Sequence, residues 1–339
     1  MRSDALRKIA SLMGLTSIEI CAGAGGQALG LEQAGFEHLA VVELDRHACA
    51  TLRRNRPYWN TLQGDLRDWR VIRYREKVDL FAGGVPCPPF SKAGKQLGGD
   101  DERDLFPTAL RLIRECQPRA ILLENVRGLL DDRFAPYRDD LSAKLLEEGY
   151  IARWKLHHAS DYGVPQLRPR TLLVALRPEV DRHFSWPKTD PTSTPTVGEA
   201  LYELMAEGGW KGAAKWAAGA ARIAPTLVGG SHKHGGPDLG PTRARREWER
   251  LGVNGKILAA EAPAPGFRGA PPLTVAMTAV LQGFPREWEF MGKKTNAYRQ
   301  IGNAFPPPVA RAVGLKIAQA LRAASREARR ADSSIVVAA

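Results

Sequence analysis

A cysteine in a proline-rich loop is the residue of this sequence best suited to act as a nucleophile. Cys87 lies in the segment Gly83-Gly84-Val85-Pro86-Cys87-Pro88-Pro89-Phe90-Ser91, directly after the apolar run Val78–Ala82, which predicts a strand. Ligands and reacting groups gather at the carboxyl ends of strands in α/β sheets, and flanking prolines restrict such a loop. Cysteines are more often buried packing residues, and that interpretation suits Cys49 and Cys116, which lie in helical patterns. It does not suit Cys87, which we therefore predict to be a nucleophile.

Two further groups could assist a nucleophile. Glu124 follows an apolar strand directly in Leu-Leu-Glu-Asn-Val, and Gln166-Leu167-Arg168-Pro169-Arg170 places two guanidinium groups in alternating register before another predicted strand. Residues at i and i+2 of an extended segment face one side, so Arg168 and Arg170 can act together. A surface acid and a solvated basic edge are the alternative interpretations.

A glycine turn and two acids indicate an adenosine site. Ala22-Gly23-Ala24-Gly25-Gly26 follows the first predicted strand, where backbone N–H groups can approach a ligand, although such glycines also form ordinary tight turns. Glu43 ends the next strand about 20 residues later, where an acid can bind both ribose hydroxyls. Asp65 could accept a hydrogen bond from an adenine amino group. The GxGG spacing, without GxGxxG, favours S-adenosylmethionine over NAD.

These groups need a scaffold that brings the ends of several strands together. Residues 15–185 show the sequence pattern of such a scaffold. Short apolar runs alternate with amphipathic stretches, which predicts βαβ units and a doubly wound parallel sheet. The predicted strands are Ser17–Cys21, Leu39–Glu43, Val78–Ala82, Ala120–Glu124, Ile151–Leu156 and Arg170–Leu176. The predicted helices between them are Gln27–Ala34, Ala48–Asn55, Pro107–Glu115 and Asp139–Glu148.

The amino-acid composition of the chain changes near Trp186. From Ser185 to Pro272 there are 10 Pro and 14 Gly in 88 residues, about 27%, against about 17% for the whole chain, so we predict a loop-rich insertion. Its run from Arg222 to Lys256 carries seven Lys or Arg against three acids. Helices are predicted again over Thr274–Leu281 and Pro308–Ala324, loops over Leu281–Pro285 and Gln300–Ala304, and a frayed tail from Arg326.

Composition limits the class of protein. The 339 residues carry 49 Lys plus Arg against 37 Asp plus Glu, a net charge of +12, which suggests a polyanionic partner such as nucleic acid. The 44% hydrophobic content excludes a disordered or fibrous chain. No apolar run approaches the roughly 18 residues of a membrane span, and no signal peptide is evident, so we expect a cytoplasmic protein. The four cysteines predict neither a disulfide framework nor a metal site.

The motifs occur in a recognisable order. ICAGAGG, VELD, GDL, GGVPCPPFS, ENV, QLRPR, LQGFP and RQIGNAFPPPVA follow one another from about residue 17 to about residue 314. This series resembles that of the cytosine-5 DNA methyltransferases of bacterial restriction–modification systems. The resemblance implies a Rossmann-like α/β catalytic domain, a smaller loop-rich target-recognition domain, and methyl transfer from S-adenosylmethionine to C5 of a flipped-out cytosine in a specific duplex DNA sequence.

The resemblance also assigns boundaries and partners. It implies a catalytic domain over residues 1–185, a target-recognition domain over 186–272, a return to the catalytic domain over 273–325, and a flexible tail over 326–339. The expected partner is duplex DNA in the cytoplasm, at the nucleoid. The expected form is a monomer, with a cognate restriction endonuclease acting separately.

The matched motif positions give the expected site residues. The catalytic residues are Cys87, Glu124, Arg168 and Arg170, with Cys87 adding to cytosine C6. The cofactor-binding residues are Cys21, Gly23, Gly25, Gly26, Glu43, Leu44, Asp65, Leu66, Pro86, Leu105 and Asn303. The DNA-binding residues expected from the motifs and the Thr-Leu element are Ser91, Gln166 and Thr226. The basic run adds Lys233, Arg243, Arg245 and Arg246.

Three positions depart from the family pattern, and three other functions use similar features. Cys21 stands where many members carry Phe, Pro88 where Gln is common, and Met277 where an acid is usual.

A tRNA cytosine-5 methyltransferase would use the same chemistry, and a catalytically silent DNA-binding regulator would keep the fold. An NAD-dependent oxidoreductase would use the glycine turn and the ribose acid but not the Pro-Cys loop.

Overall fold

The computed structural model describes residues 14–86, 104–190, 192, 194–229 and 238–338. In this part of the chain a seven-stranded sheet has the order β3-β2-β1-β4-β5-β7-β6. Its strands are β1 Leu15–Ile20, β2 Phe36–Glu43, β3 Thr61–Gln63, β4 Leu80–Gly84, β5 Ala120–Val126, β6 Ile151–His158 and β7 Pro169–Leu176. Its helices are α2 Gly26–Gln33, α3 Arg46–Asn55, α4 Phe106–Cys116, α5 Ala135–Glu147, α6 Pro178–Asp181 and α12 Pro307–Ala338.

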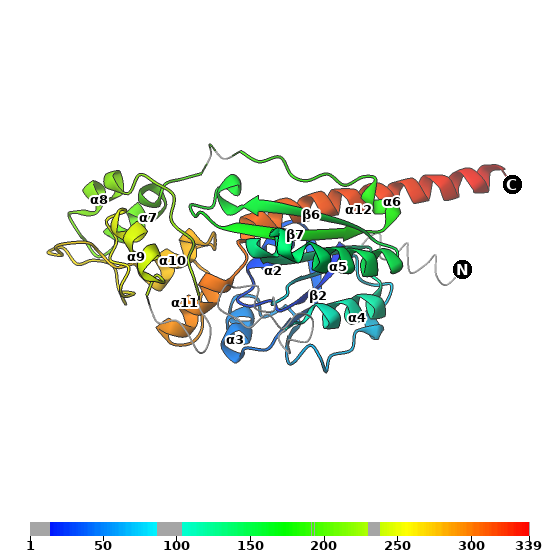
Figure 1. The fold of residues 1–339 in the computed structure, drawn as a ribbon, viewed down its shortest axis with the longest axis horizontal. Helices are drawn as coiled ribbons and strands as arrows, with labels where there is room; N and C mark the ends of the chain where they lie inside the picture. Colours follow the sequence, from blue (N-terminus) through cyan, green and yellow to red (C-terminus); the bar gives the residue numbers. More distant parts are fainter. Residues whose placement is uncertain (1–13, 87–103, 191, 193, 230–237, 339) are drawn as a thin grey trace.

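Helices cover both faces of the sheet (Figure 1). Ile18, Phe81 and Ile121 pack with α4 and α5 on one face, whereas Leu80 and Leu122 pack with α2 and α12 on the other. Strands buried on both faces are near-continuous apolar runs, which explains why the sequence predicted them well. The doubly wound α/β class is therefore confirmed.

Strand β7 runs against the expectation of an all-parallel sheet. It pairs antiparallel with both β5 and β6. Only ten residues, 159–168, join β6 to β7, and they form one short 3₁₀ turn, Ala159–Tyr162, which is too short for the crossover that parallel pairing needs. The reversal places the first residues of β7 beside the last residues of β5, with Arg170 opposite Val126.

The insertion is more helical than its glycine and proline content predicted. It contains α7 Val197–Ala206, α8 Ala213–Gly219 and α9 Thr242–Glu249, and α10 Val275–Leu281 and α11 Lys294–Asn303 follow it. Trp216 and Trp248 are buried in a core shared with α7 and α10. Thr196 and Glu199 form a capping box at the start of α7, a signal that sequence reasoning missed. Residues 300–303, predicted as loop, are the end of α11.

The C-terminal segment also differs from its prediction. Residues 326–338, expected as a frayed tail, continue α12 without a break (Figure 1). No Gly or Pro follows Gly314, and Ala, Arg and Leu favour helix strongly, so nothing local ends the helix. Glu327 forms an ion pair with Arg182, and its carboxylate lies 2.9 Å from His183 Nε2. Within the described ranges, no helix has the length and apolar character required to span a bilayer.

Candidate active site

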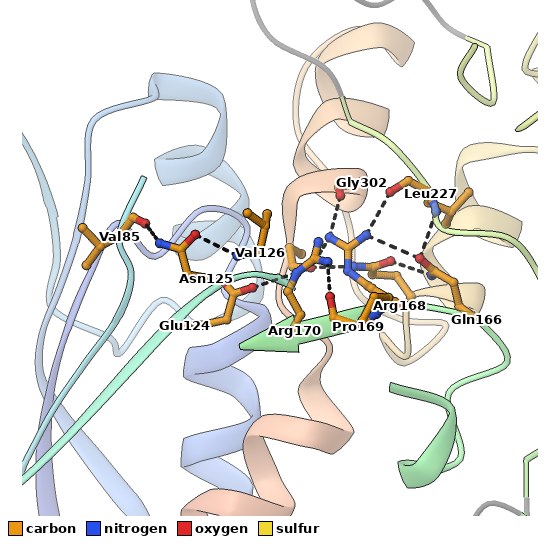
Figure 2. A network of polar contacts seen from close by, with 12 residues as sticks. Val85, Glu124, Asn125, Val126, Gln166, Arg168, Pro169, Arg170, Leu227 and Gly302 are labelled. Atoms are coloured by element: carbon orange, nitrogen blue, oxygen red, sulfur yellow. Dashed lines mark hydrogen bonds and ion pairs between the residues drawn. The ribbon is translucent and has the colours of Figure 1, made fainter. Parts of the chain in front are cut away.

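A buried ion pair joins the ends of β5 and β7. Arg170 Nε lies 2.7 Å from Glu124 Oε1, and the two side chains are only 13% and 12% exposed (Figure 2). Burial raises the pKa of the Glu124 carboxyl, and the Arg170 charge opposes this shift. The antiparallel direction of β7 creates the pair, because a parallel strand would carry Arg170 to the opposite edge of the sheet. Sequence reasoning predicted both residues, and the structure brings them together.

The loop that carries the predicted nucleophile leaves the sheet beside this pair. Gly84, the last residue of β4, is opposite Glu124 in the parallel register of β4 and β5. Asn125 donates from Nδ2 to the Val85 carbonyl at 2.9 Å, which ties β5 to the first residue of the loop (Figure 2). Cys87 and Ser91 themselves lie outside the described residues. Sequence reasoning did not assign Asn125, although the Glu-Asn-Val motif contained it.

The glycine turn forms an open cradle at the end of β1. Cys21, Gly23 and Gly25 all have positive φ, and a Cβ added at Gly23 would meet no atom within 4 Å. Glu43 Oε2 accepts from the Gly23 N–H at 2.7 Å, and Oε1 accepts from the backbone N–H groups of Leu44 and Asp45. Burial raises the pKa of the Cys21 thiol, so it stays protonated. Glu43 therefore fixes the turn and keeps acceptor capacity beside it.

The other predicted cofactor residues lie at several places around this edge. Leu66 is buried, Pro86 is exposed and Leu105 precedes α4 directly. Leu44 is 64% exposed. Asp65 follows β3 and pairs with Arg67 at 2.6 Å, so its carboxylate already has a cationic partner. Gly25 belongs to the turn and Gly26 begins α2, whereas Asn303, at the end of α11, lies beside Gly229 of the insertion.

Comparison with known proteins decides the family. The family model described as C-5 cytosine-specific DNA methylase matches residues 15–319. The chain belongs to this family. It is 57% identical to the Type II methyltransferase M.NaeI of Lentzea aerocolonigenes over 91% of the chain and 76% of that protein. It is 54% identical to the Type II methyltransferase M.NgoMIV of Neisseria gonorrhoeae over 91% of the chain and 99% of that protein.

A solved structure supports the same fold. The Entamoeba histolytica methyltransferase EhMeth matches with a TM-score of 0.61 at 15% identity, over 92% of this chain and 98% of that one. The sheet is thus a Rossmann-like methyltransferase sheet. The chain is a DNA cytosine-5 methyltransferase, as its motif series implied.

Arg168 of this methyltransferase does not share the position predicted for it. The residue is fully buried, and its guanidinium donates to the carbonyls of Leu227, Gly302 and Ala304 at 2.7–3.0 Å (Figure 2). Arg170 faces Glu124 instead. Arg168 and Arg170 therefore bind different groups, although they lie two residues apart in one extended segment. The reason is that the insertion and residues 302–304 pack against Arg168.

Gln166 also differs from its predicted role as a DNA contact. It is fully buried, its Nε2 donates to the Leu281 carbonyl and Gln282 Oε1, and its Oε1 accepts from the Leu227 N–H. The amide is thus engaged on both sides. We assign Gln166 to the packing of the methyltransferase rather than to its DNA surface.

The remaining predicted DNA contacts lie in the insertion. Thr226 is half-buried, and its hydroxyl donates to the Leu167 carbonyl. On α9, Arg243 and Arg246 are exposed and Arg245 is half-buried. Lys233 lies outside the described residues.

One departure from the family pattern and one residue outside the motifs acquire a structural meaning. Met277 accepts from the Thr274 N–H through its thioether at 3.4 Å and so occupies the third position of a capping box, normally held by an acid or amide. Trp288, which sequence reasoning missed, donates from Nε1 to the Ala24 carbonyl at 3.2 Å and supports the glycine turn from outside. Pro88 lies outside the described residues.

Proposed function

We propose that this methyltransferase acts on a cytosine flipped out of a specific duplex DNA sequence, through a covalent bond between Cys87 and C6 of the base. The observation that carries the proposal is the buried Glu124–Arg170 pair, which lies beside the strand end from which the Cys87 loop departs. A base inside a stacked duplex cannot reach such a pair, so the cytosine must be extruded, at a cost of a few kcal/mol.

The residues of the chain carry most of the chemistry. The Cys87 thiolate adds to C6 while N3 takes a proton from Glu124, which leaves C5 as the nucleophilic carbon of an enamine. Arg170 holds Glu124 in place and stabilises negative charge on the O2 side of the ring. After transfer, a base removes the C5 proton, the Sγ–C6 bond breaks, and N3 returns its proton to Glu124. Cys87 and Glu124 thereby end the cycle as they began it.

The cofactor of this proposal is S-adenosylmethionine, which supplies an electrophilic methyl group when bound. The turn at Gly23 fits such a group, because it is open above the glycine and its N–H groups lie beside the Glu43 carboxylate. Glu43 would hold the ribose, and Leu66 and Pro86 would flank the adenine. The Asp65 carboxylate would accept a hydrogen bond from the adenine amino group, either in place of Arg67 or together with it.

Glu43→Gln should weaken S-adenosylmethionine binding about tenfold or more, because an amide offers one acceptor oxygen for the three N–H groups that the carboxylate serves. Isothermal titration calorimetry measures the change. Glu115→Gln is the matched control, since Glu115 also accepts from a backbone N–H, that of Val71, away from the turn. Equal affinity of the Glu43→Gln variant and the wild type would contradict the assigned role.

The insertion, residues 186–272, is the proposed target-recognition domain. Its exposed arginines on α9 would contact phosphates, and release of counterions would make binding depend steeply on salt. We place the enzyme as a monomer on nucleoid DNA in the cytoplasm, with a cognate restriction endonuclease acting separately, in keeping with its Type II relatives.

Neutralising Arg243 and Arg246 together as glutamines should lower the slope of log affinity against log salt by about 2, because each phosphate contact contributes about 0.9. Fluorescence anisotropy with a duplex between about 50 and 200 mM salt measures the slope. Arg326→Gln/Arg329→Gln removes the same charge from an exposed part of α12, at the other end of the molecule (Figure 1). A slope that falls equally in both double variants would argue against α9 as the contact.

Bisulfite sequencing tests the proposed function as a whole. Plasmid DNA from an expressing host that lacks cytosine methylation should carry 5-methylcytosine at one recognition sequence. Unmethylated DNA together with methylated tRNA would instead support a tRNA substrate. Methylation of neither, with retained DNA binding, would support the silent regulator.

A further inference from the structure

A non-helical segment of the insertion, which follows α8, is joined to the backbone just before β7 by an isolated bridge between Ala224 and Gln166. The Leu167 N–H donates to the Ala224 carbonyl at 2.7 Å, and the Ala224 N–H donates to the Pro165 carbonyl at 2.9 Å. Leu227 is held on both sides, since its N–H donates to Gln166 Oε1 and its carbonyl accepts from Arg168, both at 2.9 Å. We call residues 224–229 the entry segment, because they lead directly into residues 230–237 and then α9.

The entry segment is also confined from the opposite side. A Cβ on Gly302 would lie 2.3 Å from the Gly229 nitrogen, and a Cβ on Gly229 would lie 2.6 Å from Asn303 Oδ1. Only glycine permits backbones to approach this closely. The segment therefore threads between Gly302 and the residues that precede β7.

Arg168 makes partial withdrawal of the entry segment unfavourable. Its guanidinium donates to the Leu227 carbonyl on one side and to the Gly302 and Ala304 carbonyls on the other, with a longer contact of 3.4 Å to Gln166 Oε1. Figure 2 shows Arg168 between Leu227 and Gly302. If the entry segment withdrew, a buried cation would lose an acceptor, which is costly in a low-dielectric interior. The position of Arg168 therefore depends on the entry segment being docked.

Arg170 lies two residues beyond Arg168 in the same extended backbone. Pro169 between them restricts φ, and Arg170 donates to the Pro169 carbonyl at 2.8 Å, so the short stretch is stiff. A shift at Arg168 must move Arg170, whose Nε lies 2.7 Å from Glu124. A physical path thus links the entry segment to the catalytic pair through residues 166–170.

We propose that Gln166 and Arg168 are positioning residues that couple docking of the entry segment to alignment of the Glu124–Arg170 pair. This inference rests on the proposed function. Correct seating of the recognition domain on DNA then favours the aligned pair, and a mismatched sequence, which seats the domain poorly, leaves the pair misaligned. The two residues therefore contribute to sequence fidelity without touching DNA.

The test compares Gln166→Leu with Arg177→Met. Gln166→Leu removes the amide at similar volume. Arg177 follows the far end of β7 and, like Arg168, donates to a backbone carbonyl, that of Glu148, and to a glutamine, Gln117. Bisulfite sequencing gives methylation rates at the wild-type recognition sequence and at sites that differ by one base pair. The ratio of these rates should fall about fivefold or more in Gln166→Leu and stay unchanged in Arg177→Met.

A purely structural role for Gln166 would lower both rates together and leave the ratio within twofold of the wild type, which would overturn the inference. Arg168→Lys keeps a donor for the Leu227 carbonyl and should retain more fidelity than Arg168→Met. Equal fidelity of the two variants would also count against the coupling.

Hydrogen exchange of the free chain separates this inference from the proposed function. Amides of residues 224–229 and 122–126 should both exchange faster in Gln166→Leu than in the wild type, and not in Arg177→Met. Acceleration confined to residues 224–229 would refute the coupling, whether or not DNA is the substrate. Absence of methylation by the wild type would refute the proposed function alone.

Discussion

The Cys87→Ala variant is expected to transfer no measurable methyl groups to DNA, a loss on the order of 10⁵-fold or more, because covalent addition at C6 is what makes C5 reactive. S-adenosylmethionine binding should stay close to that of the wild type, since the cradle at Gly23 and Glu43 belongs to other strands. Incorporation of labelled methyl groups and calorimetric titration measure the two properties.

A matched control and a covalent trap strengthen this test. Cys116→Ala removes a thiol buried in α4 and should cost stability through a small cavity while activity remains. DNA with 5-fluorocytosine at the target should form a denaturant-resistant complex with the wild type, because fluorine cannot leave as a proton does, and none with Cys87→Ala. Activity of Cys87→Ala above about one hundredth of the wild-type rate would show that methyl transfer does not require addition of the Cys87 thiolate to C6.

Glu124→Gln is expected to lower kcat about 10²- to 10⁴-fold, because glutamine can accept a hydrogen bond from Arg170 but cannot deliver a proton to N3. Burial raises the pKa of Glu124. An acid that must be protonated loses activity as pH rises through its raised pKa, so the wild-type rate should fall on the alkaline side and the residual rate of Glu124→Gln should lack this limb.

Asp181→Asn controls for the loss of an ion pair whose carboxylate is buried. Asp181 accepts two hydrogen bonds from Arg153 at 2.6 and 2.7 Å, away from the active site, so this variant should lose stability and keep its pH profile. Steady-state rates across pH, together with thermal unfolding, distinguish the two effects. A Glu124→Gln enzyme with the wild-type profile would show that another group protonates N3.

Local patterns predicted most of the scaffold. The apolar runs at β1, β4 and β5 are buried on both faces, and their hydrophobicity alone indicates a central strand. Helices α7, α8 and α9 were missed because frequent glycines and prolines masked short helices whose stability comes from packing around Trp216 and Trp248. Composition describes an average over the insertion, whereas helix formation there depends on contacts between distant residues.

Apolar runs and the turns that follow them are local features, so they predict which residues lie at strand termini. Gly23, Glu43 and Glu124 were all predicted in this way. How these strand ends face one another depends on contacts between segments that are distant in the chain. The short connection after β6 reversed β7 and brought Arg170 to Glu124. Arg168, predicted as a catalytic residue, is instead buried and donates to carbonyls 59 to 136 positions away in the sequence. A buried cation needs such acceptors, and local sequence patterns do not show which distant residues supply them.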